Sequence, residues 1–549
     1  MLRLTELKLP LDHSSEALPA AVLARLGIPE ADLLDLRVFR RGYDARKKSA
    51  ILLIYTLDLT VRNEAAVLAR FTQDPHVGRS PDTTYRFVGH ATPDETRRPL
   101  VIGAGPCGLL AGLVLAQMGF RPIILERGKV VRERTKDTWG LWRRSELNPE
   151  SNVQFGEGGA GTFSDGKLYS QIKDPQHHGR KVLEEFVRAG APEEILSVSK
   201  PHIGTFRLVT MVEHMRASIE ALGGEYRFSS KVTDLLIETR EGARQVCGVA
   251  LEDGKVIEAD HVVLAIGHSA RDTVTMLAKR GVYLEAKPFS VGMRIEHPQG
   301  MIDRCRFGDF AGNKTLGAAD YKLVHHAKNG RTVYSFCMCP GGTVVAAASE
   351  PGRVVTNGMS QYSRAERNAN AALVVGIEPR DYPGGADAGS LAGIELQRRL
   401  EEAAFRAGGG DYRAPAQLVG DFLEGRPSYA LGEVIPSYKP GVTLTDLGAL
   451  LPGYAVEAIR EAIPAFDRQL RGYARPDAVM TGLETRTSSP VRVKRGADGH
   501  SLNTRGLFPA GEGAGYAGGI LSAGVDGIKT AEAVARSLLG MEHTTARAA

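Results

Sequence analysis

A glycine motif near residue 103 has the spacing needed to hold the phosphates of a dinucleotide. Gly103, Gly105 and Gly108 form G-x-G-x-x-G between a predicted strand at 99–103 and a predicted helix at 106–118. The first glycine permits a tight turn, the second lets the backbone approach a pyrophosphate, and the third lets helix and strand pack closely. The free N–H groups and positive dipole end of the helix would then face the phosphates.

An acidic residue stands where such a motif needs one. Glu126 closes a second predicted strand at 122–126 and lies 18 residues after Gly108. Its carboxylate can accept hydrogen bonds from both ribose hydroxyls of an adenosine, and its charge disfavours a 2′-phosphate. The flanking strand, helix and acid make the motif specific, so we expect FAD or NAD at this site and not NADP.

The C-terminal segment distinguishes between these two cofactors. RGLFPAGEGAGYAGGILSAGVDG (505–527) predicts a strand at 507–511, a glycine loop at 511–519 and a helix from Ile520. This pattern resembles the closing motif of the two-dinucleotide-binding-type flavoproteins. The resemblance implies that Glu512, where the class commonly has Asp, lies near the ribityl and phosphate part of FAD. It also implies that the start of the helix backs the pyrimidine ring, where its dipole stabilises negative charge.

Further segments resemble the same class. Gly267 follows a strand-like run in ADHVVLAIGHSARDT (259–273) and would let the chain pass close to the cofactor, while Val232 would lie against the adenine. The glycine-rich segment NVQFGEGGAGTFSDGKLYS (152–170) is expected to contact the flavin, with a plain glycine turn as the alternative. It is a near-miss of a P-loop, because Leu168 stands where Mg²⁺ binding needs Ser or Thr.

Taken with CMCPGG, TNGMS and RRGYDARKK, these motifs resemble one bacterial family over nearly the whole chain. Its members are described as FAD-dependent proteins or NAD(FAD)-utilising dehydrogenases without an established substrate. The resemblance implies an FAD-dependent oxidoreductase acting on an unidentified small molecule. NAD(P)H is a candidate electron donor, although no second G-x-G-x-x-G follows a strand. The residues predicted to bind the cofactor are Gly103, Gly105, Pro106, Gly108, Glu126, Arg127, Gly158, Gly159, Gly161, Thr162, Val232, Gly267, Gly511, Glu512, Gly518, Gly519 and Ile520.

Two cysteines are the candidate catalytic residues. Cys337 and Cys339 form C-x-C, and in a regular strand both side chains would point to one face, toward the flavin or a substrate. The alternative is that both simply pack in the strand, as buried cysteines usually do. No second cysteine pair completes a zinc site, so no metal is expected.

Other polar residues are predicted to have structural roles or to face solvent. Arg294, Asn357 and Arg364 stand close to glycine turns and are predicted to be structural. The adjacent pair His177 and His178 is predicted to lie on a solvated helix surface.

The order of elements predicts an α/β fold with a discontinuous Rossmann-like FAD-binding domain at 96–285 and 500–549. An inserted mixed α+β substrate or cap domain is predicted at 286–499, and a small α/β domain at 1–95. The polar stretch 92–99 carries two prolines and is predicted to be a linker, and the tail 541–549 is predicted to be frayed.

Composition excludes several classes. With 43% hydrophobic and 24% charged residues among 549, the chain is neither mainly disordered nor fibrous. Five scattered cysteines do not form a disulfide framework. The N-terminus lacks a signal-peptide pattern, and no apolar run reaches the roughly 18 residues of a membrane span. The sequence therefore predicts a cytoplasmic protein.

The net charge of +5 is small for this length and does not by itself indicate nucleic acid as a partner. The segment RVFRRGYDARKK (37–48) has six basic residues and one acid, which leaves an RNA-modifying flavoprotein as an alternative. A non-catalytic flavin-binding redox sensor is the third hypothesis. A small-molecule substrate is the expected partner.

Overall fold

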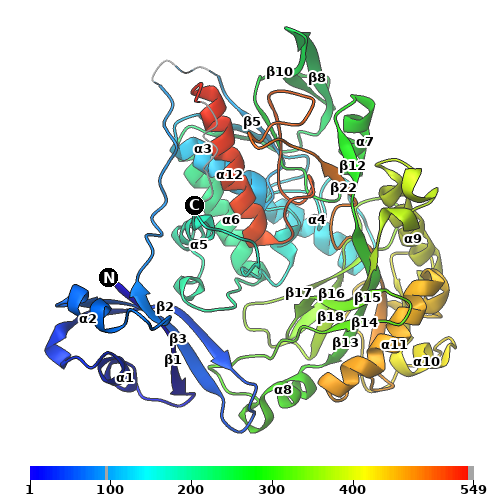
Figure 1. Cartoon of the computed structure of the whole chain (residues 1–549). Coiled ribbons are helices and arrows are strands. Elements are labelled where there is room, and N and C mark those ends of the chain that lie inside the picture. The colour runs from blue at the N-terminus through cyan, green and yellow to red at the C-terminus, as the bar shows by residue number, and fades with distance from the viewer. Residues whose placement is uncertain (93–94, 96, 542–549) are drawn as a thin grey trace.

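The computed structural model describes residues 1–92, 95 and 97–541. Figure 1 shows a parallel sheet with its helices at upper left, the N-terminal part below it, and a large mixed sheet at the right. The predicted linker lies partly outside the described residues, and the predicted frayed tail lies outside them except for Met541.

The N-terminal part is a four-stranded antiparallel sheet of order β2-β3-β1-β4. Alternate residues of β3, from Leu53 to Val61, are buried, as the period of two in a strand requires. Asn63 caps the second helix by accepting a hydrogen bond from the Ala66 N–H. The elements are β1 (Leu2–Pro10), α1 (Ala17–Leu26), β2 (Leu33–Asp44), β3 (Leu52–Val61), α2 (Glu64–Arg70) and β4 (Val77–Arg79).

The central sheet is parallel and has the order β23-β11-β5-β6-β7. Its last strand comes from the far end of the chain and pairs with β11, so the sheet is discontinuous in sequence, and the predicted Rossmann-like fold class is confirmed. The elements are β5 (Leu100–Ile102), α3 (Pro106–Gln117), β6 (Ile123–Leu125), α4 (Val131–Arg144), α5 (His178–Arg188), α6 (Thr205–Ala221), β7 (Glu225–Arg227), β11 (Val262–Leu264), α7 (Arg271–Lys279), β23 (Leu507–Pro509) and α12 (Ile520–Leu538).

Different layers cover the two faces of this sheet. Val101 and Phe508 pack with the helices α3, α6 and α12 on one face. Leu100 and Ile102 point to the other face and pack against the antiparallel sheet of β8 (Val232–Arg240), β9 (Ala243–Leu251) and β10 (Val256–Glu258). Because both faces are buried, these short strands read as continuous apolar runs in the sequence.

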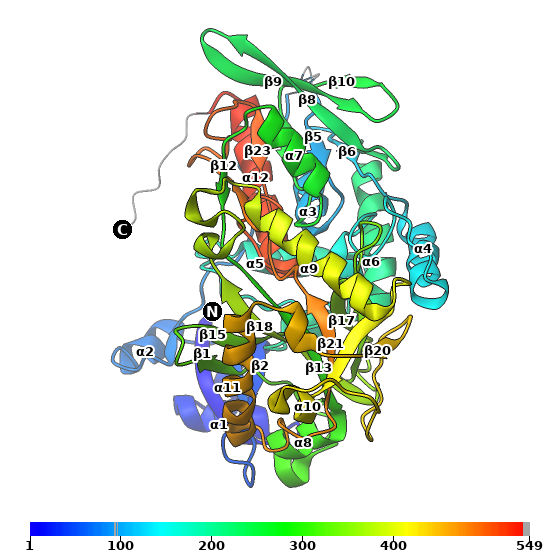
Figure 2. The same cartoon turned by 90° about the vertical axis from the view of Figure 1, so that its right-hand side faces the viewer.

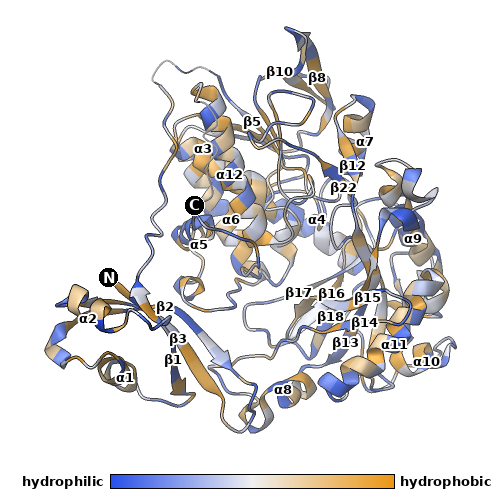
Figure 3. Cartoon of the chain, in the orientation of Figure 1, coloured by the Kyte–Doolittle hydropathy of each residue, from blue (hydrophilic) through white to orange (hydrophobic). Residues whose placement is uncertain are grey.

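The mixed sheet has seven strands in the order β14-β15-β18-β13-β21-β19-β20. Its centre is the antiparallel pair β13 and β18, which is almost wholly buried. Figure 2 shows α9 and α11 in front of this sheet, and Figure 3 shows hydrophilic residues on α9. In this part of the chain, β12 pairs with β22 and β16 pairs with β17 in two separate two-stranded sheets. The elements from 284 to 493 are β12 (Leu284–Ala286), β13 (Phe289–Pro298), α8 (Gln299–Phe307), β14 (Val324–His326), β15 (Thr332–Cys339), β16 (Gly342–Ala346), β17 (Thr356–Ser360), β18 (Asn368–Ile377), α9 (Ala392–Gly408), β19 (Ala414–Leu418), α10 (Val419–Glu424), β20 (Val442–Leu444), α11 (Gly453–Gln469), β21 (Val479–Glu484) and β22 (Val491–Val493).

Some elements differ from the sequence-based expectation. The helices α4, α7 and α11 have no predicted counterpart, and α11 carries Pro464 inside it, which argues against a helix at the level of sequence. The prediction for His178 is wrong. Its side chain is buried, with 2% of its surface exposed, because α12 covers this face of α5.

Candidate active site

One large cavity contains most of the residues that the sequence singles out. It encloses about 1770 Å³ of empty space, counted together with its opening to solvent. It lies beyond the carboxyl ends of the parallel strands, where open α/β sheets bind ligands, and strands of the mixed sheet close its other side. The predicted residues that line it are Gly103, Gly105, Pro106, Glu126, Arg127, Gly159, Gly161, Val232, Gly267, Cys337, Cys339, Gly511, Glu512, Gly518, Gly519 and Ile520.

Three predicted residues lie behind the cavity wall. A Cβ atom on Gly108 would meet the carbonyl oxygen of Gly103 at 1.9 Å, so this glycine permits the close packing of α3 on β5. Gly158 and Thr162 line a separate small space next to Met211.

The turn between β5 and α3 leaves room for a ligand. Gly103 has φ +101°, and a Cβ there would lie 2.3 Å from the carbonyl oxygen of Ala265. Among the residues that the structure describes, no side chain caps the start of α3, so the N–H groups of its first turn are left for a ligand. A Cβ on Gly267 or Gly518 would meet no atom within 4 Å, so the backbone is open at both positions. These features fit a dinucleotide.

Glu126 organises three loops at the edge of the cavity. Its Oε2 accepts a hydrogen bond from the Ala104 N–H at 2.9 Å, and its Oε1 accepts from the N–H groups of Gly128 and Gly156, each at 2.9 Å. An ionised carboxylate has about four acceptor positions. Hydrogen bonds within the protein therefore use three of the acceptor positions of Glu126. About one position is left for a ligand, whereas the sequence led us to expect hydrogen bonds from two ribose hydroxyls.

Arg134, which the sequence did not single out, supports the glycine-rich loop from below. The fully buried guanidinium donates to the carbonyl oxygens of Asn152 at 2.8 Å, Val153 at 2.7 Å, Glu157 at 2.7 Å and Gly159 at 2.9 Å. Burial lowers the pKa of Arg134 to about 10, so it remains charged at neutral pH. No local motif marks this residue, because its partners lie about two dozen positions away.

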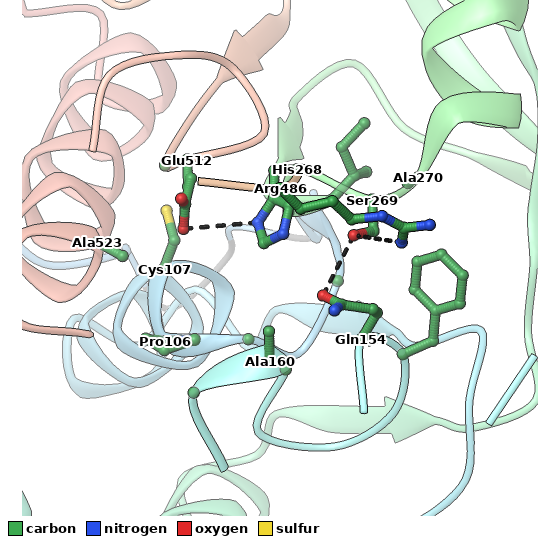
Figure 4. Close-up of a pocket in the computed structure, with 18 of the residues that line it drawn as sticks. Pro106, Cys107, Gln154, Ala160, His268, Ser269, Ala270, Arg486, Glu512 and Ala523 are labelled. Atoms are coloured by element: carbon green, nitrogen blue, oxygen red, sulfur yellow. Dashed lines mark hydrogen bonds and ion pairs between the residues drawn. The ribbon is translucent and has the colours of Figure 1, made fainter. Parts of the chain in front are cut away.

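A polar wall follows Gly267 along the chain. The Nδ1 atom of His268 lies 3.7 Å from Oε2 of Glu512, and Arg486 donates to Ser269 Oγ at 3.0 Å (Figure 4). Ser269 in turn donates to Gln154 Oε1 at 3.1 Å (Figure 4). The position of His268 and Ser269 just beyond the end of a parallel strand is the signal that would have found them.

The mixed sheet supplies the far end of the cavity. Cys337 has a positive φ of 42°, and the pairing of β15 with β18 slips between Phe336 and Cys339. The two cysteines therefore reach the same cavity through an irregular strand end, not through the regular alternation expected. Desolvation raises the pKa of the Cys337 thiol to about 12 and raises the pKa of Cys339 as well. Both remain protonated thiols at neutral pH.

Arg294 holds this end together, as the structural role predicted for it requires. It is fully buried and forms two hydrogen bonds with Glu484, at 2.5 and 2.9 Å. It also donates to Asn357 Oδ1 at 2.9 Å and to the Cys337 carbonyl oxygen at 2.8 Å. Asn357 itself lines the cavity and is thus fixed in orientation.

Within the described residues, no group of three or more His, Cys, Asp or Glu side chains is placed to hold a metal ion. In the same part of the chain, no helix combines the length and apolar character needed to cross a membrane.

Several solved structures resemble this chain at low similarity. A flavoprotein/dehydrogenase from Cytophaga hutchinsonii is 13% identical, with a TM-score of 0.36, over 82% of this chain and 81% of that one. Glycine oxidase from Geobacillus kaustophilus is 12% identical, with a TM-score of 0.33, over 82% and 96%. The match to THI4 of Thermovibrio ammonificans, at 21% identity and a TM-score of 0.25, covers 35% of this chain and 64% of that protein, less than two thirds of its length. Nothing further rests on these likenesses.

Two family models and one relative of known sequence match this chain. Residues 288–487 match a family described as FAD-dependent protein, C-terminal domain-like, and residues 1–60 match a domain of unknown function, DUF8436. An uncharacterized protein of Clostridium beijerinckii is 46% identical over 532 residues, which is 97% of this chain and 98% of that protein. The chain therefore belongs to one family with the Clostridium beijerinckii protein, its residues 288–487 form an FAD-dependent C-terminal domain-like region, and its cofactor is FAD.

Proposed function

We propose that the protein is an FAD-dependent oxidoreductase that acts on a small molecule at the far end of the main cavity. The observation that carries this proposal is the continuity of that cavity. One end is lined by the dinucleotide turn with Glu126 and Val232, and the other by Cys337 at the end of β15 and Asn357 on β17. A cofactor at the first end and a substrate at the second would therefore share one enclosed space.

The chain's own groups would bind and orient the cofactor. The N–H groups at the start of α3 would hold its pyrophosphate, and the remaining acceptor capacity of Glu126 would bind the adenosine ribose. The start of α12 at Ile520 would place its positive dipole end beside the ring. When bound, FAD supplies the acceptance and return of hydride.

At the substrate end, Phe336 and Val355 give the wall apolar surface that limits water. Asn357 presents an amide whose direction is set by Arg294. The protonated state of Cys337 and Cys339 favours a role in shaping the wall, or in donating a weak hydrogen bond, over nucleophilic attack, because the thiolate is the nucleophile.

An anaerobic titration of the FAD-loaded protein tests this function. NADH, NADPH and then a panel of hydroxy, amino and keto acids are added while the visible absorbance of the bound flavin is followed. We expect at least one donor to bleach the absorbance and an added acceptor to restore it. An Asn357→Ala variant should bleach more slowly with FAD still bound. Bleaching by dithionite alone, with none of these donors active, would contradict an oxidoreductase of this kind.

A further inference from the structure

The Lys167 side chain is largely enclosed, and its ammonium group forms no hydrogen bond with any residue that the structure describes. It follows the glycine-rich loop, and its backbone is held by an isolated antiparallel pairing with His202. The side chain lines the main cavity and is 20% exposed. It forms no hydrogen bond in the part of the chain that the structure describes, and its ion-pair contact there is Asp165 Oδ2 at 4.0 Å. An ammonium group held away from bulk water in this way favours an anionic partner.

The carboxylate of Asp165 is already matched by another cation. Arg364 donates to its Oδ1 at 3.0 Å and to its Oδ2 at 2.5 Å. Such a paired geometry is stronger and more directional than the 4.0 Å contact from Lys167. Asp320 is close enough to interact electrostatically with Lys167, but it accepts hydrogen bonds from Lys200 at 2.7 and 2.8 Å. Each of these two carboxylates is therefore held more closely by another cation than by Lys167.

Asn357 supplies a second unused donor in the same cavity. A guanidinium only donates, so the amide oxygen of Asn357 must be the atom that faces Arg294. The same oxygen accepts from the Gly358 N–H at 2.7 Å. The Nδ2 group has no partner among the described residues, and its two N–H donors are available to a ligand.

The charges at this end of the cavity do not balance. Arg364, Lys200, Arg294 and Lys167 are four cations, while Asp165, Asp320 and Glu484 are three carboxylates, so one positive charge is unmatched. The two thiols add no negative charge while they are protonated. One positive charge and one amide donor that line the same cavity match a single carboxylate. A phosphate group would instead carry a charge of about −1.5 to −2 at neutral pH.

We propose that the substrate is a carboxylic acid whose carboxylate binds between the Lys167 ammonium and the Asn357 amide. This inference rests on the proposed function, since it names the class of molecule that occupies the substrate end of the cavity. It assigns Lys167 to binding and orientation, and Asn357 to the second hydrogen bond, with Arg294 as the positioning residue.

The test uses the full-length FAD-loaded protein and matched probes. Acetate, succinate and benzoate are compared with acetamide, succinamide and benzamide, and inorganic phosphate is a separate arm. The visible absorbance of the bound flavin and the Tm of the holoprotein are both recorded during each titration. We expect a saturable response to at least one carboxylate, and no such response to its amide or to phosphate.

Variants identify the group responsible. Lys167→Met should weaken the carboxylate response by roughly tenfold or more, and Lys167→Arg should retain most of it because the charge is kept. Lys173→Met is the matched control, since Lys173 is exposed a few residues along the same segment and should bind like the wild type.

Different results would contradict FAD-dependent activity and the carboxylate site. A protein that binds no FAD would contradict the proposed function itself. FAD-loaded protein that responds to no carboxylate, that prefers phosphate, or that responds equally after Lys167→Met and Lys167→Arg would overturn the carboxylate site alone.

Discussion

The Nε2 atom of His178 lies 3.0 Å from Oε1 of Glu532, and this buried contact joins α5 to the closing helix α12. Asp174 lies on the other side of the ring, with its Oδ1 3.6 Å from Nδ1. Burial by itself lowers the pKa of His178, but the two carboxylates outweigh it and raise the pKa to about 9. The imidazole is therefore charged in the folded protein at neutral pH.

This contact predicts a pH-dependent stability. The folded pKa of about 9 is above the ordinary value of 6.5, so the contribution is complete below about pH 6.5 and is lost as pH rises through about 9. His178→Gln should lower the free energy of unfolding by about 3 kcal/mol at pH 6, and less at pH 9.5. Denaturant unfolding across this pH range measures the difference. His177→Asn is the control, because Asn tolerates the left-handed backbone at that position. A penalty independent of pH would contradict this account.

Glu126→Gln should weaken FAD binding. The glutamine side chain keeps the shape of Glu126 but loses its charge. Its NH₂ group is a donor, so it cannot replace a carboxylate oxygen that accepts hydrogen bonds. Either the bond from the Ala104 N–H or the bonds from the Gly128 and Gly156 N–H groups would be lost. We expect the Kd for FAD to rise by roughly tenfold, which is about 1.4 kcal/mol. Titration of apoprotein with FAD, followed by flavin fluorescence, measures it. Glu225→Gln on the neighbouring strand, where the side chain pairs with Arg98, should leave the Kd unchanged. Equal Kd values for all three proteins would contradict the role of Glu126.

Arg134→Lys should destabilise the glycine-rich loop although the charge is conserved. A lysine ammonium cannot reach all five carbonyl oxygens, from Asn152 to Gly159, that the guanidinium bonds. Each buried carbonyl left without a donor costs about 1–3 kcal/mol, so we expect a loss of several kcal/mol. Arg132→Lys on the same helix is a matched control, because that side chain is exposed and pairs with Glu213. Unfolding free energies that fall equally for both variants would show that the loop does not depend on Arg134.

Two glycines should respond differently to alanine. Gly108→Ala would place Cβ 1.9 Å from the Gly103 carbonyl oxygen, so β5 and α3 must separate and both stability and FAD binding should fall. At Gly518 a Cβ meets nothing within 4 Å, so Gly518→Ala should change the stability of the apoprotein by less than about 0.5 kcal/mol. It should nevertheless weaken FAD binding if the cofactor passes there. Tm and FAD affinity measured on the same preparations separate the two effects. A Gly518→Ala variant with wild-type affinity would place the ring elsewhere.

The sequence could predict the parts of the site that depend on local spacing. Gly103 to Gly108 and Glu126 belong to one β–α–β unit, so their separation along the chain determines their positions in space. The closing strand and α12 follow the same logic, with a glycine loop between short apolar and helical segments. Local pattern at the first motif, together with the family resemblance of the later segments, was therefore sufficient for the fold class and for most of the cavity lining.

Contacts between distant segments could not be predicted in this way. Arg486 meets Ser269 across more than 200 residues, and His178 meets Glu532 across more than 300. Such pairs arise only when the layers pack, and a motif around one partner, such as the segment that contains Ser269, does not indicate the other partner. The irregular end of β15 at Cys337 likewise follows from the slipped pairing with β18 and not from its own sequence.

A crystal structure of the protein with FAD bound tests the central claim most directly. The account predicts the pyrophosphate against Gly103 and Gly105 at the start of α3, the adenosine toward Glu126 and Val232, and the ring between the glycine-rich loop and Ile520. FAD found outside the main cavity, or a chain that binds no FAD even after reconstitution, would contradict it.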